Sequence, residues 1–209
     1  MTWKYVHKYN VGVIMHSDDD RLPLLCIFVV QNRLLYSQQR RMERYLYMLD
    51  HEKYMRMALK EAIKAYQQGE IPIGAVLINN ENGQVIATGY NLREQSMDAT
   101  AHAEMEAIRK GCQTLRSWRL SGCTLYVTIE PCAMCAGALV NSRIDRLVYG
   151  SNESKFGAVE SIFNVVNHKL LNHRMEVVAG VLEDECRQLM KSFFHMRRLQ
   201  NKAKKLCLN

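Results

Sequence analysis

The residues best suited to chemistry lie in two short stretches, His102-Ala103-Glu104 and Pro131-Cys132-Ala133-Met134-Cys135. One imidazole and two thiolates make a set of ligands that suits Zn²⁺. With only three protein ligands, a tetrahedral zinc keeps a fourth position, which normally holds a water. Zinc lowers the pKa of such a water toward neutrality, so hydroxide becomes available at physiological pH. Glu104 is then the candidate proton carrier.

Each half of this pattern has a plainer interpretation when taken alone. A single C-x-x-C also fits a structural zinc site or a redox pair. A structural zinc would need a fourth ligand, for which the chain offers Cys112, Cys123, His168 and His173. The joint occurrence of H-A-E and P-C-A-M-C, in that order, favours a catalytic zinc.

Two helices are expected to position these side chains. Thr100 is a suitable N-cap for a helix that begins near His102. Pro131 is a suitable first residue for a second helix, which would carry Cys132 and Cys135 on one face. Two helix N-termini directed at one metal would also stabilise its thiolates through the helix dipoles.

The remaining pattern from Asp50 onward alternates helices with strands. Apolar spacing predicts a helix from about residue 50 to Gly69, and a final one from Glu183 to about Lys204. Five strands are predicted at residues 73–79, 84–90, 123–129, 146–150 and 176–181, and a further helix at residues 159–166. This alternation predicts an α/β fold with helices on both faces of the sheet.

Composition is compatible with an enzyme of the cell interior. The 209 residues, 48% of them hydrophobic, are enough for one globular domain with a substantial core. A net charge of +7 suits a polyanionic partner without requiring one. Seven cysteines in an irregular arrangement are typical of reduced thiols, so we expect a cytoplasmic protein. No apolar run approaches the roughly 20 residues of a spanning helix, so we expect no membrane association.

Residues 1–47 differ from the rest of the chain. They contain strand-like pieces at residues 11–15 and 24–30 for which no partner is evident. We expect an N-terminal extension of unknown role over residues 1–47 and a zinc-dependent domain over residues 48–209. A mis-called start, with Met48 as the true first residue, would also explain the extension.

Several short motifs in the sequence resemble those of a known family. From about Met48 to Lys205 the chain resembles the bacterial tRNA-specific adenosine deaminases, members of the cytidine-deaminase-like superfamily. The two zinc motifs identify the superfamily, and the motifs nearer the C-terminus are typical of its tRNA-specific members. The matching words are Glu70-Ile71-Pro72-Ile73-Gly74-Ala75-Val76, Gly89-Tyr90-Asn91, Ala101-His102-Ala103-Glu104, residues 125–138, Lys155-Phe156-Gly157-Ala158, Leu171-Asn172-His173-Arg174 and Phe193-Phe194-His195-Met196-Arg197-Arg198.

The resemblance implies a three-layer α/β/α sandwich with a central five-stranded mixed sheet, a homodimer, and conversion of a tRNA wobble adenosine to inosine. It implies that His102, Cys132 and Cys135 bind zinc and that Glu104 transfers protons. The substrate-binding positions it implies, in the pocket and along the anticodon stem-loop, are Asn91, Ala103, Glu153, Lys155, Phe193, Phe194, Arg197 and Arg198. Glu153 stands where many relatives carry Asp or Asn. Taken alone, Asn91 would be a turn residue, and Phe193 and Phe194 would be core residues.

Two other functions use the same zinc stretches. One is a deaminase of a free base such as guanine or cytosine, and the other is a non-catalytic RNA-binding module stabilised by zinc. The basic end of the final helix disfavours the first, because a neutral base has no phosphates to bind. Glu104 disfavours the second, because binding zinc does not require it. The basic residues are Arg197, Arg198, Lys202, Lys204 and Lys205.

Overall fold

The computed structural model describes residues 4–6, 11–13 and 50–206, and the chain divides into two compact units, residues 1–47 and 48–209. In the first unit, β1 (Lys4–Val6) and β2 (Val11–Val13) form an antiparallel pair. β2 falls within the strand predicted at residues 11–15, whereas the strand predicted at residues 24–30 lies outside the described residues.

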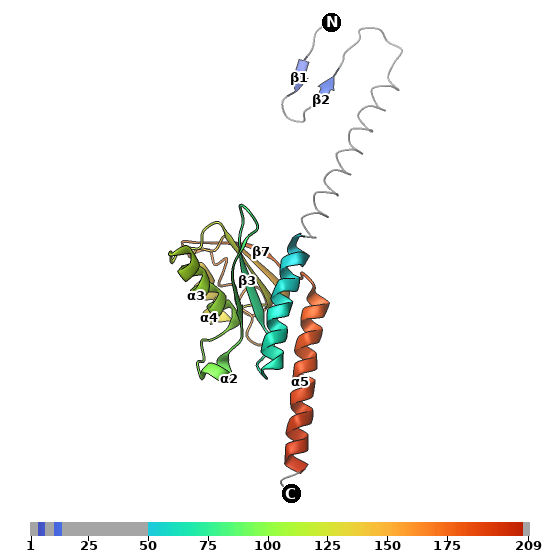
Figure 1. Cartoon of the computed structure of the whole chain (residues 1–209). Helices are drawn as coiled ribbons and strands as arrows, with labels where there is room; N and C mark the ends of the chain where they lie inside the picture. The colour runs from blue at the N-terminus through green and yellow to red at the C-terminus, as the bar shows by residue number, and fades with distance from the viewer. Residues whose placement is uncertain (1–3, 7–10, 14–49, 207–209) are drawn as a thin grey trace, which may run out of the picture. The chain divides into compact units, whose positions relative to one another are not determined.

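A five-stranded mixed sheet forms the centre of the second unit (Figure 1). β3 pairs antiparallel with both β4 and β5, while β6 runs parallel to β5 and to β7. The predicted mixed sheet of five strands is therefore confirmed. In spatial order the strands are β4 (Val85–Tyr90), β3 (Gly74–Asn79), β5 (Cys123–Ile129), β6 (Arg146–Ser151) and β7 (Glu176–Val178).

Helices cover both faces of the sheet, as the alternating pattern predicts. In β5 and the strands beside it, side chains alternate between two hydrophobic clusters. Leu125 and Val127 pack on the face that carries α3 (Ala103–Leu115) and α4 (Ala133–Asn141). Tyr126 packs on the opposite face, with the helix at residues 50–67 and α5 (Glu183–Leu206) (Figure 1).

Two glycines allow the covering helices to approach the sheet closely. A Cβ at Gly74 on β3 would lie 2.1 Å from the carbonyl oxygen of Ala58. A Cβ at Gly89 on β4 would lie 2.2 Å from the carbonyl oxygen of Ala103, the first residue of α3. The start of α3, which follows His102, therefore rests directly on the sheet backbone.

Two predicted elements are wrong in extent or type. The strand predicted at residues 176–181 ends at Val178. Residues 159–166 form turns and irregular backbone rather than a helix. The reason is that the N–H groups of Phe163 and Val165, which in a helix would donate to carbonyls four residues earlier, donate instead to the carbonyls of Gly157 and Ala158. The turn before them is held by Glu130, whose carboxylate accepts the backbone N–H groups at residues 159–161. The short helix α2 (Arg93–Ser96) was not predicted.

No helix within the described part of the chain has both the length and the apolar character needed to cross a membrane.

Candidate active site

His102, Cys132 and Cys135 meet at one point, although 30 residues separate the first two in the sequence. Their potential ligand atoms all lie within 4.8 Å of one another. His102 Nδ1 is 3.7 Å from Cys132 Sγ and 3.6 Å from Cys135 Sγ. Zn–S and Zn–N bonds of ordinary length in a tetrahedron put sulfur and nitrogen about 3.6 Å apart. The cluster therefore has both the donor set and the spacing that zinc requires.

The N-termini of two helices hold this cluster. His102 is the N-cap residue of α3, and Cys132 is the N-cap residue of α4, whose first turn contains Cys135. Both cap residues have extended backbone, and neither uses its side chain to cap its helix. The expectation that Pro131 begins the helix is wrong, because the helix starts at Ala133. The helix dipoles nevertheless favour thiolates at this point, as predicted.

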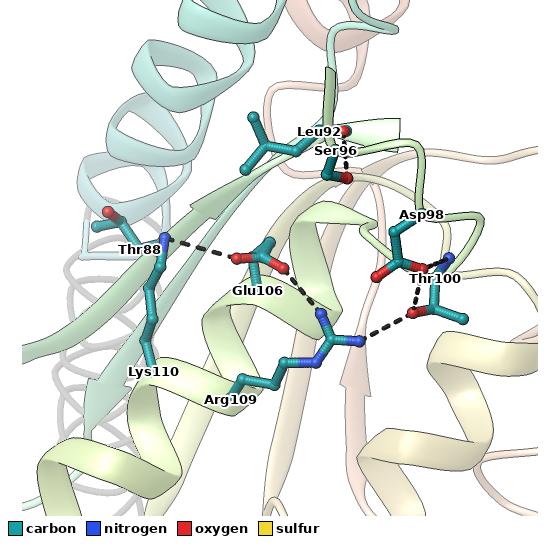
Figure 2. A network of polar contacts seen from close by, with 8 residues as sticks. All are labelled: Thr88, Leu92, Ser96, Asp98, Thr100, Glu106, Arg109 and Lys110. Carbon is teal, nitrogen blue, oxygen red and sulfur yellow. Dashed lines mark hydrogen bonds and ion pairs between the residues drawn. The ribbon is translucent and has the colours of Figure 1, made fainter. Parts of the chain in front are cut away.

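Thr100 does not cap α3, contrary to the prediction. Its backbone N–H and hydroxyl both donate to Asp98 Oδ1, each over 2.7 Å. The hydroxyl also accepts a bond from Arg109, whose other terminal nitrogen donates to Glu106 over 2.9 Å (Figure 2). This network ties the loop before His102 to the side of α3. The loop is thus anchored by side chains, and the His102 ring is left to face the cysteines.

Glu104 lies in the first turn of α3 and outside the cluster of His102, Cys132 and Cys135. Its side chain is 3% exposed, and its Oε2 is a buried oxygen with no hydrogen-bond partner among the described residues. Burial raises the pKa of this carboxyl to about 6. A carboxyl of this pKa can both accept and release a proton near neutral pH, which is what a proton carrier needs.

The two cysteines shift each other's pKa in opposite directions. The hydrogen bond from Cys135, with burial opposing it and His102 assisting it, lowers the pKa of Cys132 to about 4. The same shared hydrogen bond raises the pKa of Cys135. The cluster thus contains one sulfur that is already a thiolate, the form that binds metals.

Asn91 directly follows β4 and is buried, with 2% of its surface exposed. Its Nδ2 donates to Glu70 Oε2 over 3.0 Å, and its backbone N–H donates to the carbonyl of Ile73. Glu70 is itself 1% exposed and was not among the predicted site residues. The signal that could have identified it is a glutamate placed between a helix-ending glycine and an apolar strand.

Glu153 and Lys155 lie in the irregular segment that follows β6. The Glu153 carboxylate accepts the backbone N–H of Lys155 over 2.9 Å, and Lys155 is exposed. The segment is held by Glu130, a second buried glutamate that sequence reasoning missed, which is 3% exposed. Burial favours a higher pKa for Glu130, but its hydrogen bonds outweigh that effect and keep the pKa below its usual value. Ala103 is also buried, as the first residue of α3.

The remaining predicted residues form a second group on α5, an element that contributes no residue to the cluster of His102, Cys132 and Cys135. Phe193 is a core residue, 5% exposed, and packs edge-on against Tyr66 and Phe194. Phe194 is 43% exposed. Arg197 lies over the Phe193 ring at 5.9 Å, and Arg198 is exposed to solvent. This group presents an aromatic ring and two cations on one helix.

Comparisons with known proteins agree with this geometry. Residues 49–198 match the family model of the MafB19-like deaminases. The chain is 48% identical to a tRNA-specific adenosine deaminase of Bacillus subtilis over 156 residues, which cover 75% of this chain and 96% of that protein. It is 47% identical to a Haemophilus influenzae protein of the same name, over 75% of this chain and 90% of the relative.

A solved structure from work on A-to-I editing by tRNA:A34 deaminases at the wobble position of transfer RNA shares the fold, with a TM-score of 0.63 and 43% identity. The match covers 66% of this chain and 98% of that one. Sequence, fold and the His-Cys-Cys cluster thus agree, and the chain belongs to the family of the tRNA-specific adenosine deaminases, within the cytidine-deaminase-like superfamily.

Proposed function

We propose that this protein catalyses the hydrolytic deamination of a wobble adenosine in a tRNA anticodon, which yields inosine and ammonia. The observation that carries the proposal is the pairing of the His102, Cys132 and Cys135 cluster with a buried, unpartnered Glu104 oxygen. Family membership identifies adenosine in tRNA as the substrate, because the relatives bear that name.

The chemistry needs a nucleophilic water and a group that moves its protons. One Zn²⁺ held by His102, Cys132 and Cys135 would lower the pKa of a water to near neutrality. Glu104 accepts the proton that this water loses. It then delivers a proton to ring nitrogen N1 of adenine as the C6–O bond forms. Glu104 next takes the remaining proton from the new C6 hydroxyl and passes it to the C6 amine. Ammonia departs as the C6–N bond breaks, and the C6 oxygen becomes the carbonyl of inosine.

A tRNA anticodon loop suits this site because its bases are already single-stranded, so that moving one into a pocket costs little. The basic residues of α5 and Lys155 would contact its phosphates, and the exposed Phe194 ring would stack on a base. We further propose that the protein acts in the cytoplasm as a homodimer. The exposed apolar side chains of Phe156, Ile162 and Phe163 supply surface for such an interface.

The test is product analysis on an anticodon stem-loop with adenosine at the wobble position. The zinc-loaded protein should form inosine, and Glu104→Gln should retain one zinc per chain while losing turnover. Inosine formation at the parental rate by Glu104→Gln would contradict the mechanism. Activity on free guanine or cytosine, with none on the stem-loop, would instead establish a small-molecule deaminase.

We also propose that residues 48–209 suffice for this activity. A chain beginning at Met48 should fold, bind zinc and deaminate the stem-loop like the full chain, because the family match begins at residue 49. An insoluble or inactive product would show that residues 1–47 belong to the catalytic unit.

A further inference from the structure

Glu70 is a buried carboxylate that the proposed chemistry does not use. It follows the turn that ends the helix at residues 50–67, and only 1% of its surface is exposed. Its Oε1 accepts the backbone N–H of Gln95 over 2.9 Å, and its Oε2 accepts Asn91 Nδ2 over 3.0 Å. Both of its oxygens therefore bind groups that lie beyond β4 in the sequence.

The two groups that donate to Glu70 differ in whether they can rotate. The N–H of Gln95 belongs to the backbone of α2 and can only donate. The Gln95 side chain adds to the anchoring of that helix by donating to Gln68 over 2.7 Å. Asn91 has a fixed backbone too, but its amide group can present either its nitrogen or its oxygen by turning half a revolution. A carboxylate accepts and never donates, so only one of these two orientations satisfies Glu70.

We propose that Glu70 is a positioning residue that fixes the orientation of the Asn91 amide against the nucleoside. The inference rests on the proposed function and on the contact between Asn91 and the target nucleoside that the family resemblance implies. With the amide nitrogen turned toward Glu70, the carbonyl oxygen faces away from it, and the pattern of donors and acceptors offered to the nucleoside is defined. Glu70 touches no reacting atom and acts through Asn91.

The substitution Glu70→Gln separates this role from simple stabilisation. The Gln95 N–H still needs an acceptor, so the new amide oxygen turns toward it and the new amide nitrogen faces Asn91. Two amide nitrogens cannot bond each other, and Asn91 reverses to offer its oxygen. Position 70 keeps its shape and both hydrogen bonds, but the Asn91 amide now points the wrong way.

The experiment compares Glu70→Gln, Asn91→Ala and the double variant, each loaded with zinc, on the anticodon stem-loop. Glu70→Gln should raise KM by about tenfold, the worth of one misdirected hydrogen bond, with kcat within a few-fold of the parent. The double variant should match Asn91→Ala alone, because there is no amide left to misdirect. The matched control is Glu61→Gln, another buried glutamate, which is bonded to Lys64 and not to Asn91. It should leave KM unchanged.

Three results would overturn the proposal. A parental KM in Glu70→Gln would show that the Glu70 carboxylate does not set the orientation of the Asn91 amide. If Glu70→Gln raised KM by the same factor in the parent protein and in the Asn91→Ala variant, the role of Glu70 would be purely structural. A parental KM in Asn91→Ala would remove the substrate contact on which the inference rests.

A readout without activity distinguishes these failures from a wrong assignment of the reaction. In ¹⁵N-labelled protein, the Asn91 side-chain amide protons should show the downfield shift of a bond to a carboxylate, and Glu70→Gln should abolish it. A parent enzyme that leaves the stem-loop unchanged, yet shows this signal and its loss, would contradict the proposed function while supporting the amide orientation. An Asn91 amide signal that is the same in both proteins would refute the orientation itself.

Discussion

Glu130→Gln should destabilise the protein far more than its isosteric shape suggests. The Glu130 carboxylate closes the segment after β6 by accepting several hydrogen bonds from it. Oε1 accepts the N–H groups of Val159 over 3.0 Å, Glu160 over 2.8 Å and Ser161 over 2.9 Å. Oε2 accepts the N–H of Glu153 over 3.0 Å and also the Ser161 hydroxyl. The glutamine amide can replace only one of these two oxygens.

The expected loss in the free energy of unfolding follows from these hydrogen bonds. Retaining Oε1 keeps three backbone bonds, but each becomes a bond to a neutral oxygen and weakens by about 1 kcal/mol. The NH₂ group then faces the Glu153 N–H, and leaving that buried donor unpaired costs about 1–3 kcal/mol. The Ser161 hydroxyl can rotate and accept instead. Burying an amide rather than a charge offsets part of this loss, so we expect a net loss of about 3–4 kcal/mol.

Denaturant unfolding followed by circular dichroism measures this loss, and the melting temperature should fall by about 10 °C. The matched control is Glu61→Gln, which removes a buried carboxylate whose ion pair with Lys64 is half exposed. That variant should stay within about 1 kcal/mol of the parent. A Glu130→Gln protein as stable as the control would refute the idea that this carboxylate holds the segment.

Three further perturbations test other parts of the molecule. Cys135→Ala should lose both zinc and stability, because metal binding is coupled to folding; one zinc per chain by elemental analysis would contradict the ligand set. Neutralising Arg197, Arg198 and Lys202 together should weaken stem-loop binding and flatten its salt dependence without changing zinc content; an unchanged salt slope in titrations would show that α5 makes no phosphate contacts. Burial, with Arg146 assisting, lowers the pKa of His51 from 6.5 in the folded protein. The unfolded chain therefore takes up the proton first as pH falls, and the free energy of unfolding should drop below about pH 6.5. His51→Gln should show a shallower drop, and an identical pH profile would rule out His51 as its source.

The cluster of His102, Cys132 and Cys135 could be predicted because its information is local. H-x-E and P-C-x-x-C place a ligand at the start of each of two helices, and the order of elements then brings those helix ends together. β5 was predicted with its observed bounds, Cys123–Ile129, because all seven of its residues are buried and apolar or β-branched residues dominate it. The end of β7 could not be predicted as well, since its residues are exposed or half-buried and do not impose a strict period.

The predicted helix at residues 159–166 failed for a different reason. Its apolar spacing fits a helix, but Glu130, about 30 residues earlier in the chain, holds the N–H groups at residues 159–161 in a turn. The N–H groups that follow donate to the carbonyls of Gly157 and Ala158 and not to those four residues earlier. No local pattern contains that information. Thr100 is a similar case at shorter range, because its hydroxyl donates to Asp98 and accepts from Arg109, so two side chains already bind it.

Glu70 and Glu130 hold irregular backbone that apolar packing could not hold alone. Each faces backbone N–H groups that no helix or strand pairs: one on α2, and three on the turn at residues 159–161. An apolar side chain in either place would leave those donors buried without an acceptor, at a cost of about 1–3 kcal/mol for each donor. A neutral amide would satisfy some donors and oppose others. A carboxylate accepts with both of its oxygens, so Glu70 and Glu130 can each hold more than one donor of the irregular backbone. Because a carboxylate accepts hydrogen bonds and donates none, Glu70 also permits only one orientation of the Asn91 amide.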